Sequence, residues 1–144
     1  MFSVVLFIIS CHFGLPPINH GVYLEKISND SPEFDFQHVL TAAFSREILK
    51  HQATGGTPLS IVVIRAQETV IAHDGTGQQW ELTLQIRAGL PSKNPLELTE
   101  RVRFVLDNDG DLAFPAARQD AYHRAAEKLA AHAVQIILYS PDMK

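Results

Sequence analysis

Two segments in the middle of the chain alternate apolar and polar residues with a period of two. In the first segment the apolar members are Trp80, Leu82, Leu84, Ile86 and Ala88. In the second they are Leu96, Leu98, Val102, Phe104 and Leu106, with Glu100 as the one polar residue in the apolar set. Successive side chains of a strand point to opposite faces, so each segment predicts a strand with one buried and one solvent-facing side. A sheet of this kind needs a second layer over its apolar face.

Two segments with helical periodicity can supply that layer. One covers residues 36–51, and the other follows Phe114-Pro115 and continues to about residue 137. Apolar residues recur at intervals of three and four in both, so each helix has one face that can pack on a sheet. The glycines and the proline of residues 53–58 end the first helix.

Residues 20–27 and 59–72 complete the predicted strands. In the first of them, alternation places Val22, Leu24 and Lys26 on one face. The string Asp74-Gly75-Thr76-Gly77 predicts a hairpin turn after the second. The element order is therefore strand, helix, three strands, helix. It predicts a single α+β domain over residues 20–144, a two-layer sandwich whose four-stranded, mixed and mostly antiparallel sheet is covered by two helices.

The chain begins with an apolar run that ends at its only cysteine. Residues 2–9 match the apolar region of a secretory signal in length and character. Ile8, Ser10 and Cys11 match the positions that the signal peptidase of bacterial lipoproteins reads. Residues 1–10 are thus predicted to be a signal peptide cleaved between Ser10 and Cys11, with Cys11 as the lipidation site. The glycine and two prolines of residues 11–19 predict an extended tether behind this anchor.

Two points leave an alternative open at this end of the chain. A secretory signal normally carries Lys or Arg before its apolar region, and Met1-Phe2-Ser3 contains neither. We therefore expect the true translation start to lie upstream, within a longer reading frame. The alternative is a buried N-terminal strand with an incidental cysteine.

Composition and motifs exclude several classes of function. The chain has 12 Lys and Arg against 16 Asp and Glu, with no basic cluster, so a nucleic-acid partner is not expected. Asp107–Asp111 resembles a calcium loop, but Leu112 stands where an EF-hand requires glycine, so a solvated turn is expected. The seven histidines lack metal-ligand spacing, and nucleophile and nucleotide-binding motifs are missing. We expect no enzyme activity, no metal and no cofactor.

Four strings of the sequence occur in an order that is typical of one family. They are Cys11-His12-Phe13-Gly14-Leu15, the strand Val22-Tyr23-Leu24-Glu25 after a proline-containing lead, the hairpin from Asp74-Gly75 through Leu84, and Tyr-x-Arg-Ala-Ala-Glu-x-Leu from Tyr122 to Leu129. In this order the chain resembles LptE, the lipoprotein family of the outer-membrane lipopolysaccharide translocon. The resemblance covers nearly the whole chain after Cys11.

The resemblance implies a lipoprotein anchored on the periplasmic side of the outer membrane. Its domain would plug the lumen of a large outer-membrane β-barrel (LptD-like), help that barrel assemble and contact lipopolysaccharide. His12 after the cysteine, in place of aspartate, resembles the outer-membrane sorting pattern. Family members often carry a basic residue near the hairpin tip, where this chain has His73. Arg101, Arg103 and Arg118 are further candidate anion contacts by charge, and the alternative for them is a solvated surface.

Two other readings of the sequence stay open. An auxiliary or binding lipoprotein of another envelope transport system would share the same anchor and the same sandwich. A small hydrolase is disfavoured because no catalytic constellation is found.

Overall fold

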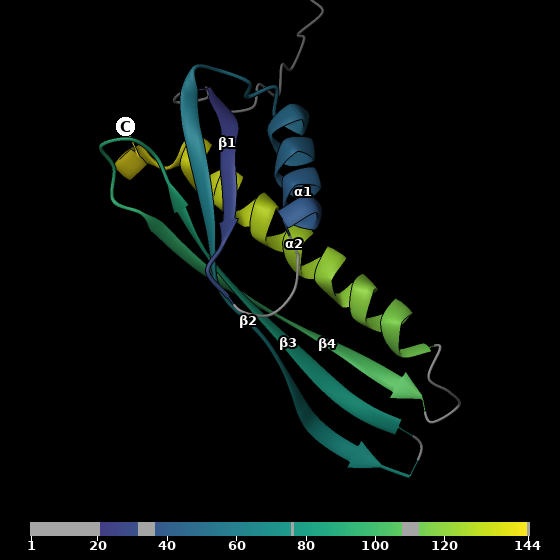
Figure 1. Ribbon diagram of the computed structural model, residues 1–144. Coiled ribbons are helices and arrows are strands. Elements are labelled where there is room, and N and C mark those ends of the chain that lie inside the picture. Colours follow the sequence, from purple (N-terminus) through teal and green to yellow (C-terminus); the bar gives the residue numbers. More distant parts are fainter. Residues whose placement is uncertain (1–20, 32–36, 76, 108–112, 144) are drawn as a thin grey trace, which may run out of the picture.

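The computed structural model describes residues 21–31, 37–75, 77–107 and 113–143 (Figure 1). The signal peptide, Ser10, Cys11 and the tether predicted from the sequence lie outside these residues. Six strands and helices and one short 3-10 helix follow one another: β1 (Val22–Asn29), α1 (Gln37–Lys50), β2 (Thr57–Asp74), β3 (Gly77–Gly89), β4 (Leu96–Asp107), α2 (Ala113–Tyr139) and η1 (Pro141–Met143). The predicted order of strands and helices is confirmed.

The four strands form one mixed sheet in the order β1-β2-β3-β4. β1 runs parallel to β2, with α1 as the connection between them, whereas β2, β3 and β4 pair antiparallel. A parallel neighbour requires a crossover connection, and short turns suffice for antiparallel ones. The hairpin between β2 and β3 lies where Asp74-Gly75 predicted it, since Asp74 pairs with Gly77.

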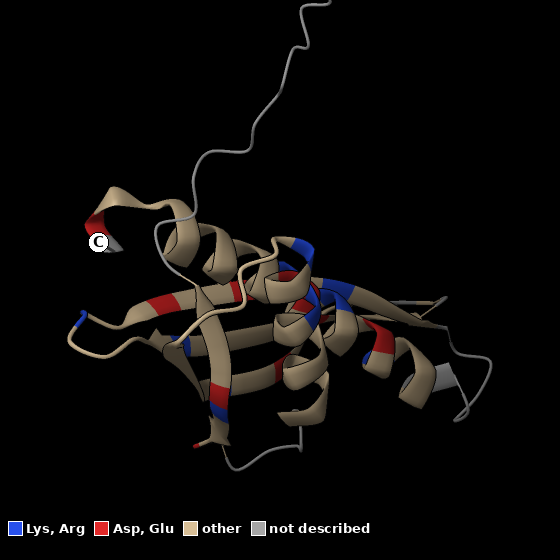
Figure 2. Ribbon diagram, turned by 90° about the horizontal axis from the view of Figure 1, so that it is seen from above, with Lys and Arg blue, Asp and Glu red and all other residues tan. Residues whose placement is uncertain are grey.

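Both helices lie on the same face of the sheet (Figures 1 and 2). α2 packs across β4 and β3, and α1 packs between α2 and β1. The predicted two-layer sandwich is confirmed. No described helix covers the opposite face of the sheet, which we call the open face.

The core between the two layers is apolar throughout. The alternating strands supply Leu82, Leu84, Ile86, Val102 and Phe104, all buried as expected. Polar residues and charges are absent from the fully buried set of the described chain. The largest fully buried side chains are Phe44, Leu40, Leu59, Ile61, Leu82, Leu84, Ile86, Leu129, Ile137, Leu138, Val22 and Val63.

β1 departs from the alternation predicted for it. A register shift between Leu24 and Lys26 marks a β-bulge in its pairing with β2. Leu24 and Ile27 both pack against the core, whereas Lys26 is exposed. The prediction that Lys26 shares the face of Val22 and Leu24 is therefore wrong, because an extra residue in one strand reverses the faces after it.

The helix ends differ slightly from the predicted ones. α1 ends in a Schellman-type arrangement, in which the Ala53 amide donates to the Ile48 carbonyl and the Gln52 amide to the Leu49 carbonyl. Gln52 has a φ of 52° there, which is the left-handed conformation of this cap. α2 begins at Ala113, so Pro115 lies within its first turn rather than before it. Proline is tolerated there because the first amides of a helix have no intrahelical acceptor.

Two glycines allow the start of β1 to lie very close to the segment before β2, with which it forms a parallel bridge between Val22 and Thr54. The Val22 amide donates to the Ala53 carbonyl at 2.8 Å, and the Gly55 amide donates to the Val22 carbonyl at 3.2 Å. A Cβ built on Gly55 would lie 2.4 Å from the Cα of Gly21, and one built on Gly21 would lie 2.7 Å from the Cα of Gly55. The two backbones can approach this closely only because neither residue has a side chain.

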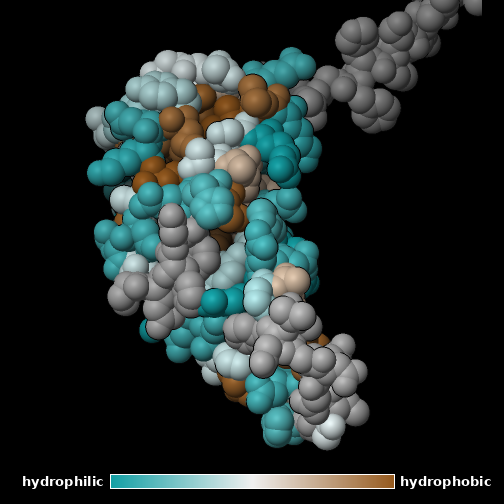
Figure 3. Space-filling view, turned by 45° about the vertical axis from the view of Figure 1, so that its right-hand side comes forward, coloured by the Kyte–Doolittle hydropathy of each residue, from teal (hydrophilic) through white to brown (hydrophobic). Residues whose placement is uncertain are grey.

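The β2–β3 hairpin extends well beyond β1. β1 pairs with β2 only as far as Val63, whereas β2 continues to Asp74. Toward the end of the hairpin several apolar side chains are exposed, namely Val70, Ile71 and, on β4, Val105. Apolar atoms also reach the surface in this part of the space-filling view (Figure 3).

Candidate functional site

Arg118 lies on the helix side of the sheet and is held by acidic and aromatic neighbours. Its Nε donates to Oε1 of Glu68 at 2.5 Å, and the Tyr122 hydroxyl donates to the same oxygen at 2.9 Å. The guanidinium carbon lies 5.9 Å from the centre of the Tyr122 ring. The side chains of Arg118 and Glu68 are only 24% and 12% exposed. Arg118 thus joins α2 to β2 and presents little of its charge to an external anion.

Because of the cluster of Arg118, Glu68 and Tyr122, the protein should lose stability at alkaline pH. Burial, followed by the hydrogen bond to Glu68 and the Glu68 charge, raises the pKa of Tyr122 far above its ordinary value. The unfolded chain releases this proton near pH 10, whereas the folded chain retains it. The stability that Tyr122 contributes is therefore complete below about pH 10 and is lost as the pH rises above that value.

Tyr122→Phe should reduce the fall in the free energy of unfolding that occurs at alkaline pH. At pH 8 the variant loses the hydrogen bond to Glu68 and should be less stable by about 1 kcal/mol. Between pH 9 and 11 its free energy of unfolding should fall less steeply than that of the native protein, because it has one fewer group that ionises on unfolding. Urea unfolding over this pH range measures both effects. Tyr23→Phe, at an exposed tyrosine of β1, is the control. If the slope for Tyr122→Phe equals that of the native protein, Tyr122 is not the group that causes the alkaline loss of stability.

The other candidate residues predicted from the sequence lie elsewhere. Arg101 and Arg103 are exposed on the open face of β4, and Nε of Arg103 lies 3.4 Å from Oε2 of Glu81. His73 is exposed near the end of β2, at the hairpin. The structure therefore brings Arg101 and Arg103 together, places Arg118 on the opposite side of the sheet, and leaves His73 at the distal end.

On β2, β3 and β4 the open face consists of cross-strand rows made mostly of polar residues. Within each row the pairing of β2, β3 and β4 fixes the three neighbours. From the β1 end toward the hairpin the rows are Val62–Arg87–Glu97, Arg65–Gln85–Thr99, Gln67–Thr83–Arg101, Thr69–Glu81–Arg103 and Ala72–Gln79–Val105. These rows contain four arginines and two glutamates, so this part of the open face is positive in a chain whose net charge is -4.

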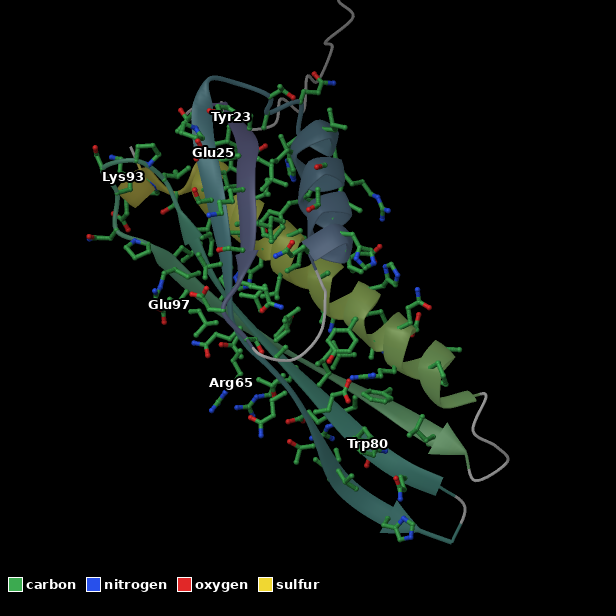
Figure 4. The ribbon with its side chains drawn as sticks, viewed as in Figure 1. Tyr23, Glu25, Arg65, Trp80, Lys93 and Glu97 are labelled. Carbon is green, nitrogen blue, oxygen red and sulfur yellow. The ribbon has the colours of Figure 1, made fainter. Side chains whose placement is uncertain are left out.

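The two glutamates of these rows each lie close to one arginine. Nη2 of Arg87 lies 2.6 Å from Oε1 of Glu97, and Glu81 faces Arg103. In the two rows between these pairs, Arg65 and Arg101 are exposed and have no ion pair within the described part of the chain. Figure 4 shows Arg65 pointing away from the helix layer.

Arg65 was missed by the sequence analysis. The preceding residues, Val62, Val63 and Ile64, are all apolar, so alternation does not tell which face Arg65 occupies. The structure has a register shift between Val63 and Arg65. This β-bulge returns Arg65 to the open face, and no local signal in the sequence could have placed it there.

A groove of about 400 Å³ lies between α1 and α2. Its charges are largely compensated, since Nη1 of Arg46 lies 2.9 Å from Oε1 of Glu127 and Nζ of Lys50 lies 3.5 Å from Oε1 of Glu47. At its edge His51 bridges the helix ends, with Nδ1 3.1 Å from the Tyr139 hydroxyl and Nε2 3.1 Å from Glu47. The contacts of Arg46 with Glu127 and of His51 with Tyr139 join the two helices.

Within the residues that the structure describes, no three His, Cys, Asp or Glu side chains gather as metal ligands would. None of the described helices is both long enough and apolar enough to cross a membrane.

Comparison with solved structures identifies the fold. A minor lipoprotein from Acinetobacter baumannii aligns with a TM-score of 0.54 and 12% identity, over 81% of this chain and 92% of that one. The rare lipoprotein B of Shewanella oneidensis aligns with a TM-score of 0.55 and 13% identity, over 78% and 93% of the two chains. This chain has the fold of small bacterial lipoproteins. A protein from Xanthomonas campestris aligns equally well, with a TM-score of 0.54 and 11% identity over 82% and 83%.

No protein-family model matches the sequence, and no curated protein matches it either. At identities of 11–13% the shared feature is the arrangement of helices and strands. A fold of this kind can carry different functions, so function must be argued from the site and the anchor.

Proposed function

We propose that this chain is an outer-membrane lipoprotein that plugs a large β-barrel translocon, assists its assembly and contacts lipopolysaccharide on its way to the outer leaflet. Cys11 carries the acyl chains, and the domain from β1 to α2 is the plug. The protein has no catalytic role in this proposal.

One combination of observations carries the proposal. The only cysteine follows a short apolar run, and the domain behind it has a fold found in solved lipoproteins of Acinetobacter and Shewanella. Either observation alone is weak, because apolar runs and α+β sandwiches are both common. Together they favour an anchored envelope protein, and the LptE-like strings of the sequence favour the translocon among such proteins.

The surface of the domain suits a polar lumen. Charged residues of both signs are distributed over strands and helices (Figure 2), and much of the surface seen in Figure 3 is hydrophilic, with apolar residues showing mainly in its upper part. Wide β-barrels of the outer membrane have polar interiors. The domain keeps most of its apolar residues in one internal core. Its exposed surface is largely polar, with Tyr23, Leu49, Val70, Ile71 and Val105 as the large apolar side chains that reach it, so it can sit in such a lumen with little apolar area facing the lumen wall.

Co-purification tests this proposal. A tagged full chain, expressed in its native cell and extracted in mild detergent, should retain one large β-barrel membrane protein through two purification steps. Depletion of the chain should lower the amount of correctly folded barrel and of lipopolysaccharide at the cell surface. A helical inner-membrane transporter as the retained protein would contradict the plug and would support an auxiliary lipoprotein of another transport system.

A further inference from the structure

We propose that the outer edge of β2 over residues 65–74, which we call the β2 edge, pairs antiparallel with the same edge of a second copy of this chain. The two four-stranded sheets would then form one continuous sheet. This inference goes beyond the proposed function and does not depend on it, because it concerns only how the chain associates with itself.

The β2 edge is the part of β2 that β1 leaves uncovered. β1 pairs with β2 only as far as Val63, and the Asp30 amide, which donates to the Val63 carbonyl at 3.0 Å, marks the end of this pairing. Beyond it β2 continues to Asp74 with β3 on one side and no strand of the described chain on the other (Figure 1). The backbone groups along such an edge form a template for a further strand.

The other two edges of the sheet carry features that oppose pairing. β4 has Glu100 on its helix side, where it pairs with the buried Leu84, and an inward-pointing charge disfavours an added strand. β1 has only eight residues, with a bulge and the exposed Lys26. The β2 edge contains neither lysine nor proline, and the charge of its inward-pointing Glu68 is compensated by Arg118. Of the three edges, the β2 edge is therefore the one that best accepts another strand.

The ladder positions of the β2 edge determine the register of the pair. Nine residues of the edge pair with β3, because Ile71 is left out at a β-bulge. Two copies overlap along the whole edge only when the fifth of these nine residues, Thr69, lies on the twofold axis. A pair of threonines across antiparallel strands is favourable, whereas an axis at Glu68 would bring two like charges together.

The length of the β2 edge favours a second copy as the occupant. In the register centred on Thr69, the hairpin turn of each copy reaches the place where β1 ends in the other. Each hairpin thus covers the whole stretch that the other leaves open. The exposed apolar residues of the edge, Val70 at 45% and Ile71 at 40%, lie next to this axis. A second strand beside them removes apolar area from water, which favours association.

Site-specific disulfide formation tests the register. The full chain carries Cys11→Ser, so that each introduced cysteine is the only thiol. Thr69→Cys should form a disulfide-linked dimer under mild oxidation, because opposite residues of an antiparallel pair have Cα atoms about 4.5–5.5 Å apart, within the range of a disulfide. Gln67→Cys, at an exposed residue of the same face, is the matched control. Its two copies would lie about 14 Å apart, so its yield of dimer should be at least about tenfold lower.

A charge substitution tests the association itself. Thr69→Lys would bring two positive charges together on the twofold axis. It should raise the dissociation constant of the dimer at least about tenfold, measured by sedimentation velocity over a range of concentrations. Thr99→Lys makes the same change at an exposed threonine of β4 and should leave the dissociation constant unchanged.

Three results would overturn the proposal. They are a chain that stays monomeric at every concentration, equal disulfide yields for Thr69→Cys and Gln67→Cys, and a dimer that Thr69→Lys does not weaken. Association through the apolar residues 2–9 would give the last of these results, since it does not involve β2. None of the three outcomes decides whether a barrel is retained in the co-purification experiment.

Discussion

Cys11→Ser is expected to abolish lipid attachment completely. In cells fed a labelled fatty acid, the native chain should carry the label and the variant should show none above background, because the thiol is the only acceptor for the diacylglycerol. The share of the variant found in the membrane fraction should also fall, because the acyl chains on Cys11 would supply the anchor.

The conservative change Ser10→Ala is the control for this experiment. It keeps a small residue before the predicted cut and should preserve both label and membrane attachment. Intact-mass analysis of the native chain gives an independent result. An unmodified polypeptide that retains Met1 would exclude the anchor and would favour the alternative of an N-terminal strand with an incidental cysteine.

Gly55→Ala is expected to cause the largest loss of folding stability. The new Cβ would lie 2.4 Å from the Cα and 2.5 Å from the carbonyl carbon of Gly21, and these are backbone atoms that cannot rotate away. The close contact between the start of β1 and the segment before β2 must therefore open. We expect the free energy of unfolding to fall by about 2–3 kcal/mol, as overpacking typically costs, measured by urea unfolding.

The neighbouring glycine provides the matched control. A Cβ on Gly56 would meet no atom within 4 Å, so Gly56→Ala should change the stability by less than about 0.5 kcal/mol. Gly21→Ala should resemble Gly55→Ala, because the same two backbones collide. Equal stability of the Gly55 and Gly56 variants would contradict the close approach of Gly21 and Gly55.

The fold followed from the sequence because its signals are local. Alternation along β3 and β4 can be recognised from nearest neighbours, and each apolar face requires a covering layer. The hairpin at Asp74-Gly75 depends on residues that tolerate the turn. Two predictions were wrong. In β1 a bulge changes the face of Lys26, and α2 begins before Pro115 rather than after it. Such shifts depend on pairing with a distant strand or on the geometry of a helix end.

The site was only partly predictable. Alternation correctly placed Arg101 and Arg103 on one polar face of β4. It did not indicate that Glu68 would engage Arg118, since these residues are 50 positions apart and meet only when α2 packs on the sheet. It also missed Arg65, whose face depends on a bulge in β2. Which arginines keep an uncompensated charge is a property of cross-strand pairing, and no short stretch of sequence contains that information.

Periodicity, turn residues and the position of the single cysteine can be recognised directly in the sequence. They were sufficient to predict the α+β sandwich and to propose the lipid anchor. The open face, its two uncompensated arginines and the close contact of Gly21 with Gly55 exist only in the folded chain. The physical reason is distance along the sequence: side-chain period and turn chemistry act between near neighbours, whereas charge compensation and close backbone contact arise between segments that only folding brings together.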